Sequence, residues 1–192
     1  MKFAFSRRIL LFLAVVVLCM GAIALAAFGY YPILIVNGSP VFAAKFFQHV
    51  RAMSLFQERV AQAYPKAIRG SPPSREELEA GVLDGLVEER LLNQSIRREV
   101  GREADGLVEE KLQGLIQEEA KFGKATEALY GLSLGEFRQE VLVPQAERDI
   151  VKGRLFLRGE SIDDWAEANR RAARVTVLST RFKWDGEKIV AK

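Results

Sequence analysis

The chain has 192 residues, and its 28 Lys and Arg residues against 25 Asp and Glu residues give a formal net charge of +3. Lys2, Arg7 and Arg8 account for this whole excess, so residues 32–192 are formally neutral, and they contain no block of basic residues. This argues against a nucleic-acid-binding protein. One histidine, His49, and one cysteine, Cys19, cannot form a metal site of the His and Cys type, so the sequence predicts no metal and no cofactor.

The first predicted element is an uncharged apolar segment from Ile9 to Tyr31. A helix needs about 20 apolar residues to cross a bilayer, and a basic flank favours the cytoplasmic side. We therefore expect a cytoplasmic flank at residues 1–8, a transmembrane signal anchor at 9–31 and an extracytoplasmic domain at 32–192 of a single-pass membrane protein. The alternative is a signal peptide cleaved near Ala26, because residues 24–26 have the small-x-small pattern of such sites. Cleavage would leave a soluble periplasmic or secreted domain.

A hairpin and a helix should follow. The β-prone run 33–36 leads into Asn37-Gly38, the dipeptide best suited to the positive φ angles of a two-residue turn. From Ala43 to about Tyr64, apolar residues recur at the spacing of a helix. They are Phe46, Phe47, Val50, Met53, Phe56 and Val60.

Ser74 and Glu77 have the spacing of a capping box, which predicts the start of a second helix that ends at Gly101. Gly81 and Gly85 lie four residues apart in this helix, a spacing that permits close packing against another helix. A further helix should run from about residue 105 to 122, with Gly123 as its stop, before a short helix at 126–130.

A second capping box, Ser133 and Glu136, predicts a long helix in which Pro144 should produce a kink. Ser161 marks the start of a last helix. The chain then turns β-prone, with expected strands around 175–178 and 189–190 and a turn at residues 185–186. We expect residues 33–36 to pair with the segment 175–182 in a small sheet.

Three segments, in their order and spacing, resemble the N-terminal chaperone domain of SurA/PrsA-type foldases. They read VNGSPV at 36–41, LDGLVEERLL at 83–92 and YGLSLGEF at 130–137. The resemblance covers roughly residues 33 to 192. It implies a mainly α fold, a multi-helix lobe of the SurA N-terminal type with a small sheet that joins N- and C-terminal strands, preceded by one transmembrane helix. It also implies a folding factor that binds unfolded or nascent exported polypeptides.

The chain departs from that family in two places. Family members often have Ser or Thr before the first helix, where this chain has Phe42-Ala43. Many relatives also insert a parvulin isomerase domain before the last helix. Here Leu155 is followed almost at once by Ser161, which leaves no room for a domain of about 100 residues. Parvulin chemistry, as the family is understood, uses several histidines, and this chain has only one. The sequence therefore predicts a chaperone without catalytic activity.

An apolar groove between the first helix and the helices that begin near Ser74 and Ser133 is the expected site for client segments. The same apolar positions of the first helix also suit an ordinary core. The candidate client-binding residues are Phe46, Phe47, Val50, Phe56, Leu129, Tyr130 and Phe137.

Two other functions remain compatible with the sequence. One is a peptidyl-prolyl isomerase-type foldase, or a subunit of one, with a site that the sequence does not reveal. The other is a structural or assembly subunit of an envelope complex that binds one fixed partner.

Overall fold

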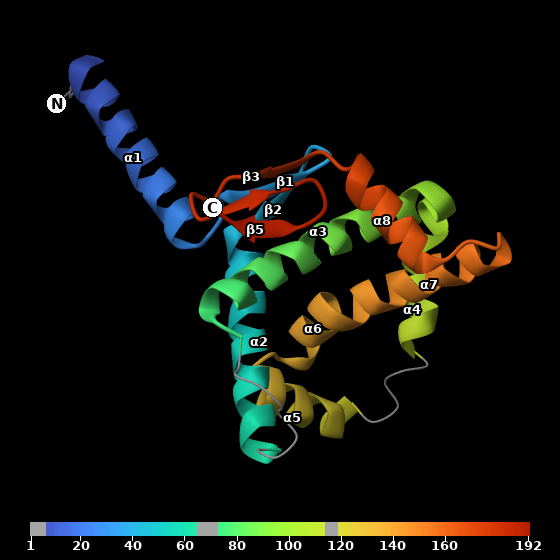
Figure 1. Cartoon of the computed structure of the whole chain (residues 1–192). Coiled ribbons are helices and arrows are strands. Elements are labelled where there is room, and N and C mark those ends of the chain that lie inside the picture. The colour runs from blue at the N-terminus through green and yellow to red at the C-terminus, as the bar shows by residue number, and fades with distance from the viewer. Residues whose placement is uncertain (1–6, 65–72, 114–118) are drawn as a thin grey trace.

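The computed structural model describes residues 7–64, 73–113 and 119–192 (Figure 1). Helix α1 (Arg7–Ala27) projects away from the rest of the chain, and its described apolar side chains are exposed. Among the described residues, no helix combines the length and the hydropathy needed to cross a membrane. The transmembrane helix expected from the sequence thus has no support here and stays a prediction.

A three-stranded antiparallel sheet joins the two ends of the domain. Its strands are β1 (Pro32–Val36), β2 (Ser39–Phe42) and β3 (Val175–Val177), in the order β2-β1-β3. Asn37 and Gly38 connect β1 to β2 with φ angles of 50° and 81°, the two positive angles that this tight turn requires. The predicted hairpin and the predicted pairing of the N- and C-terminal segments are both confirmed.

A second hairpin completes the β structure. Strands β4 (Phe182–Trp184) and β5 (Ile189–Ala191) pair antiparallel, with Asp185 and Gly186 in the connection. Phe182 and Ile189 are buried in the same core as β1, and Trp184 packs against that core. Both β units therefore cover one side of the helical lobe, as Figure 1 shows for the sheet beside α3 (Arg75–Val100).

The other regular elements of the described residues are helices, as predicted. The capping boxes at Ser74 and Ser133 are both present with their reciprocal hydrogen bonds, and Gly101 ends α3 with a φ of 67°. The remaining helical elements are α2 (Ala43–Ala63), η1 (Gly101–Glu103), α4 (Ala104–Gln113), α5 (Glu119–Tyr130), α6 (Leu134–Phe137), η2 (Arg138–Leu142), α7 (Val143–Leu157) and α8 (Ile162–Ala172).

The prediction that Gly123 ends a helix is wrong, because α5 runs through it. A glycine inside a helix costs about 1 kcal/mol relative to alanine, and tertiary packing offsets this here. Phe122 contacts Phe137 edge-on, with ring centroids 5.7 Å apart, and Tyr130 stacks on Phe56 of α2 at 4.8 Å. These contacts hold both ends of α5 against its neighbours.

Pro144 changes the helical hydrogen bonding. It has no N–H to donate to the carbonyl of Glu140, four residues earlier. The preceding residues, Arg138–Leu142, form a π-helical turn, in which the N–H of Val143 bonds to the carbonyl of Arg138. The irregularity expected at Pro144 is therefore a π-turn between α6 and α7, and it sets the direction in which Glu140 projects.

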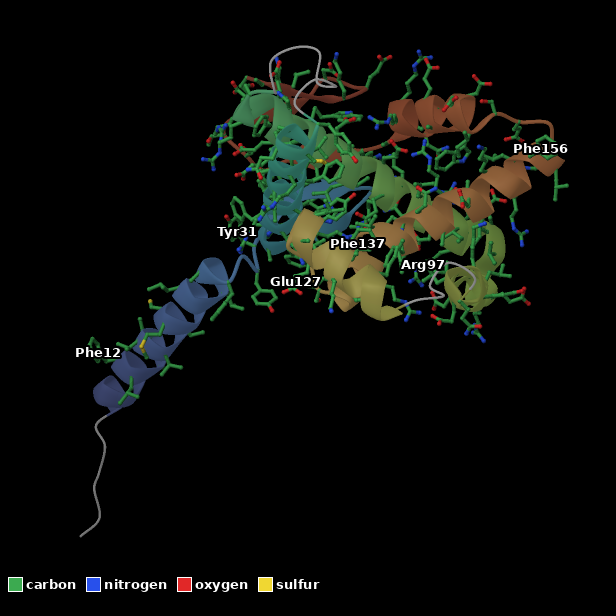
Figure 2. The ribbon with its side chains drawn as sticks, turned by 90° about the horizontal axis from the view of Figure 1, so that it is seen from below. Phe12, Tyr31, Arg97, Glu127, Phe137 and Phe156 are labelled. Carbon is green, nitrogen blue, oxygen red and sulfur yellow. The ribbon has the colours of Figure 1, made fainter. Side chains whose placement is uncertain are left out.

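Helix α3 contributes to two cores. Leu83, Leu86 and Val87 are at most 2% exposed and pack against the sheet, together with Phe46 of α2. Further along, Leu92 and Ile96 pack against α4 and α7. A third, smaller cluster joins α2 to the segment from α5 to η2 through Ala52, Leu132 and Phe137. Phe156, 80% exposed, lies at the end of α7 far from Phe12 of α1 (Figure 2).

An ion-pair network ties α8 and the second hairpin to α3. Arg170 of α8 donates to both carboxylate oxygens of Asp84, each at 2.9 Å, and to Glu88 at 3.0 Å. Asp84 also accepts the backbone N–H of Ile189 in β5. Glu88 accepts a further hydrogen bond from Arg148 of α7. Asp84 thus connects three separate segments from one side chain.

We predict that Asp84→Ala lowers the free energy of unfolding by roughly 2–3 kcal/mol, because it leaves Arg170 half-buried without its main acceptor and removes the partner of the Ile189 N–H. The comparison is Asp149→Ala, whose exposed pair with Lys111 should contribute less than about 1 kcal/mol. Urea unfolding followed by circular dichroism measures both. Equal losses in the two variants would contradict the role of Asp84.

Candidate functional site

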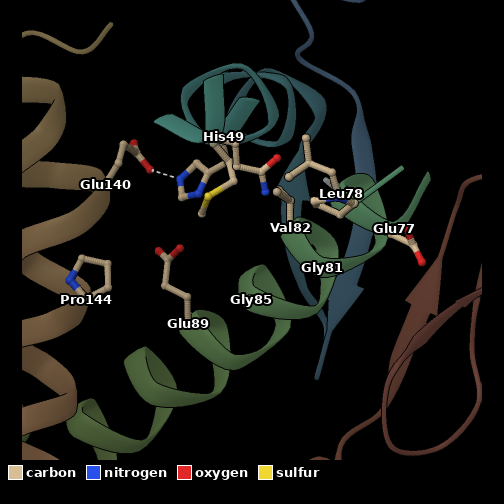
Figure 3. Close-up of a pocket in the computed structure, with 12 residues that line it drawn as sticks. His49, Glu77, Leu78, Gly81, Val82, Gly85, Glu89, Glu140 and Pro144 are labelled. Carbon is tan, nitrogen blue, oxygen red and sulfur yellow. Dashed lines mark hydrogen bonds and ion pairs between the residues drawn. The ribbon is translucent and has the colours of Figure 1, made fainter. Parts of the chain in front are cut away.

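A cavity of about 460 Å³ lies between α2, α3 and the start of α7 (Figure 3). Its wall is mainly apolar. Met53 comes from α2, Leu78 and Val82 come from α3, and Pro144 comes from α7. This volume lies within the range of about 300–1,000 Å³ that is usual for ligand pockets.

Two neighbouring cavities extend this space into a groove. One, of about 310 Å³, shares His49, Met53 and Glu140 with the first and continues toward Phe56 and Tyr130. The other, of about 280 Å³, shares Glu89, Glu140 and Pro144 with the first and runs between α3 and α7. We call these three cavities together the α2–α3–α7 groove. It lies where the sequence predicted a groove, between the first helix and the helices that begin near Ser74 and Ser133.

One stripe of α3 forms a wall of the groove. Leu78, Val82 and Glu89 lie on it with Gly81 and Gly85, at the three- and four-residue spacing of a single helix face. A Cβ added to either glycine would meet no described atom within 4 Å. Among the described residues, no other helix packs closely against these glycines, contrary to the expectation from their spacing. Each glycine destabilises the helix. No contact between helices offsets this destabilisation among the described residues.

Charged side chains meet at the centre of the groove. Lys45 of α2 contacts Glu89 of α3 at 2.6 Å and Glu140 of η2 at 3.0 Å. His49 Nε2 lies 2.8 Å from the same Oε2 atom of Glu140. Figure 3 shows His49, Glu89 and Glu140 reaching one space from three different helices. The π-turn before Pro144 supplies Glu140, so the irregular helix geometry is part of the site.

The surroundings lower the pKa of Glu140 and raise the pKa of Lys45. The hydrogen bond with His49 lowers the pKa of Glu140, burial opposes it, and the charge of Lys45 adds to the lowering. Burial acts to lower the pKa of Lys45, but the attraction and hydrogen bonds of Glu89 and Glu140 outweigh burial and raise it overall. Both groups are therefore held in their charged forms at neutral pH.

The pKa of Glu147, on α7, shifts in the opposite direction to the pKa of Glu140. Its side chain is buried, with the residue 7% exposed, and accepts a hydrogen bond of 2.9 Å from Asn93 of α3. Burial raises its pKa, and the Asn93 hydrogen bond only partly opposes this. Glu147 lines none of the three cavities of the groove. We regard it as a polar contact between α3 and α7.

The structure divides the predicted client-binding residues among several places. Phe46 is buried against the sheet, and Phe137 is buried among the rings of Phe122 and Tyr130. Val50 is half-buried beside Phe46. Phe56 and Tyr130 line the 310 Å³ extension of the groove. Phe47 and Leu129 are 51% and 39% exposed and lie outside the groove, with Phe47 on a separate hollow beside Arg51.

The residues that form most of the groove are not the aromatic ones singled out from the sequence. Met53 belonged to the helical apolar pattern of α2, and Gly81 and Gly85 were noted only for packing. Glu140 carried no signal of its own. The π-turn that directs it, however, follows from Pro144, and a proline inside a helical pattern is visible in the sequence.

The described residues offer binding surface rather than reactive groups. Within the ranges 7–64, 73–113 and 119–192, no three His, Cys, Asp or Glu side chains are arranged to hold a metal ion. His49 faces a carboxylate, and among the described residues that line the groove there is no Ser or Cys nucleophile. Comparisons with protein-family models, curated proteins and solved structures find no match to this chain.

Glu147→Gln and Glu140→Gln should change stability in opposite directions. A raised native pKa means that folding favours protonated Glu147, so the ionised side chain destabilises the protein above that pKa. Glu147→Gln should therefore be more stable than the wild type at pH 7, and its advantage should fade as the pH drops through the shifted pKa. The lowered pKa of Glu140 gives stability that is present at pH 7 and lost in acid. Glu140→Gln should therefore be less stable at pH 7, with a deficit that vanishes at low pH.

Thermal unfolding of both variants and the wild type between pH 3 and pH 8 measures these differences. Two pH profiles that run parallel to the wild type would contradict both assignments.

Proposed function

We propose that this protein is a non-catalytic chaperone that binds unfolded exported polypeptides reversibly in the α2–α3–α7 groove. The observation that supports it is the groove itself. Apolar side chains from three helices line a continuous open space, and two glycines of α3 widen it without serving helix packing. An adaptable apolar surface with a flexible methionine suits the binding of many different segments.

The similarity of three sequence segments to SurA/PrsA-type foldases supports the same function. In the fold, these segments form the first hairpin, the centre of α3 and the α5–α6 junction. The last two border the groove, since Gly85, Glu89, Tyr130 and Leu132 line its cavities. The resemblance and the geometry therefore point to the same surface.

Membrane attachment through residues 9–31 is part of the proposal and rests on the sequence. Residues 9–31 carry no charge, follow three basic residues and are long enough to span a bilayer. The exposure of Phe12, Leu18 and Ile23 on α1 is compatible with lipid contact. A tether would raise the local concentration of the groove near chains that emerge from the membrane.

Gly85→Leu provides a test in which binding and stability should change in opposite directions. The added side chain fills the groove, while the loss of a helical glycine should stabilise the fold by about 0.5–1 kcal/mol. The matched control is Gly106→Leu in α4, which also has open space around it but lies outside the groove.

We predict that the purified full chain slows the aggregation of a chemically unfolded model protein, measured by light scattering. Gly85→Leu should need roughly tenfold more protein for the same effect, which corresponds to about 1.4 kcal/mol of binding. Gly106→Leu should match the wild type. A wild type that does not slow aggregation, or a Gly85→Leu variant as active as the control, would refute the function. Covalent trapping of a single fixed partner in cells would favour an assembly subunit instead.

The tether makes a separate prediction. The full chain, expressed with its N-terminus intact, should stay in the membrane fraction after alkaline carbonate extraction and retain its N-terminal residues in intact-mass measurement. Met20→Arg should release it, because an arginine near the centre of a spanning helix costs about 2.5–3.5 kcal/mol. A soluble product that begins just after Ala26 would show that the segment is a cleaved signal peptide.

A further inference from the structure

The charges in the largest cavity of the groove are mostly negative. The one arginine among the described groove residues, Arg148, lines the 280 Å³ cavity and pairs with Glu88. Of the residues that line the largest cavity, four are ionisable: His49, Glu77, Glu89 and Glu140, with no lysine or arginine among those described. Glu77 is occupied by its capping box with Ser74. Glu89 and Glu140 therefore dominate the electrostatics of the apolar space, and the apolar wall reduces the screening of their charges by water.

Each of these two carboxylates has one oxygen atom that makes no hydrogen bond or ion pair with a described residue. Among the described residues, Glu89 uses only its Oε1 atom, in the contact with Lys45, and Glu140 uses only Oε2, which it shares between Lys45 and His49. No buried side-chain oxygen in the described structure lacks a hydrogen-bond partner. The second oxygens of Glu89 and Glu140 therefore reach solvent, and both residues line the largest cavity of the groove.

Lys45 shows that a cation fits between the two carboxylates. Its ammonium group contacts both of them, at 2.6 and 3.0 Å, although it comes from outside the largest cavity and does not line it. One ammonium group serves two carboxylates. His49 is the other partner of Glu140. A guest cation that arrives through the groove would still meet the second carboxylate oxygens as acceptors.

We propose that the groove selects polypeptide segments in which apolar side chains flank a lysine or arginine, whose cation binds Glu89 and Glu140. Lys45 then acts as an internal substitute that partly neutralises the carboxylates while no client is bound. The apolar neighbours of the guest cation pack against Met53, Leu78 and Val82. Selectivity arises because the charged hydrogen bonds form in a partly desolvated space. This inference rests on the proposed chaperone function.

The experiment measures binding of three labelled peptides to the full chain by fluorescence anisotropy. All three contain the same leucine, serine and glycine residues, and their central residue is arginine, citrulline or glutamate. Citrulline keeps the shape of arginine without its charge. The expected order of affinity is arginine, then citrulline, then glutamate, with arginine favoured over citrulline by roughly tenfold at low salt and by less at high salt.

Two substitutions should move this preference in opposite directions. Glu89→Gln should remove most of the arginine preference and leave citrulline binding almost unchanged. Lys45→Met should increase the arginine preference, because it removes the internal competitor for both carboxylates. Glu110→Gln, on the exposed face of α4, makes the same charge change as Glu89→Gln and should behave as the wild type. Circular dichroism verifies that each variant is folded, and the peptide comparison on the wild type needs no variant.

The outcomes distinguish a failure of the charge-selectivity inference from a failure of the proposed chaperone function. If the wild type binds the three peptides equally and Gly85→Leu weakens all of them, the groove binds polypeptide but has no charge selectivity, and this inference is wrong. If Lys45→Met weakens arginine binding, Lys45 is not a competitor and the inference is also overturned. If no peptide binds, the proposed function itself fails.

Discussion

Helix α3 is the constraint on which the rest of the fold depends, because a single 26-residue helix must satisfy different neighbours on different faces. One face, with Leu83 and Val87, is buried by the sheet and the second hairpin. Another carries Gly81, Gly85 and Glu89 into the groove. Arg170 holds α8 to Asp84 and Glu88 of the same helix. Helices α2, α4, α7 and α8 and strands β1 and β5 all contact α3. The groove is a part of the α3 surface that other helices leave uncovered.

The groove stays open because its walls are fixed by contacts elsewhere. The stacked rings of Phe56 and Tyr130 join α2 to α5, and the sheet fixes the start of α2 through the hydrogen bond from Ala43 to Tyr31. Beside the groove, ion pairs add to the apolar contacts that connect α2 to α3 and to η2. Charged groups in a partly apolar space are costly unless they have partners. In the groove, Lys45 and His49 are these partners for Glu89 and Glu140.

Local signals predicted most of the fold. The Asn37-Gly38 turn, the capping boxes at Ser74 and Ser133 and the stop at Gly101 all appear as expected, because each depends on a few neighbouring residues. Gly123 shows where such reasoning fails. Its intrinsic cost is about 1 kcal/mol, whereas the aromatic contacts of Phe122 and Tyr130 on either side are made with residues distant in sequence. A groove lies between the three helices that the sequence indicates, but Phe46 and Phe137, which the sequence places in it, lie in cores.

The sequence by itself determined the mainly helical class, the positions of most helix ends and the pairing of the terminal strands. These follow from hydrophobic periodicity, helix capping and composition, which are properties of short segments or of the amino-acid content of the chain. Only the tertiary structure decided which apolar residues are core and which line the groove, because a helical stripe does not specify its partner. It also decided that Glu89, Glu140 and Lys45 meet, since that contact joins three helices over 95 residues and depends on a π-turn at Pro144.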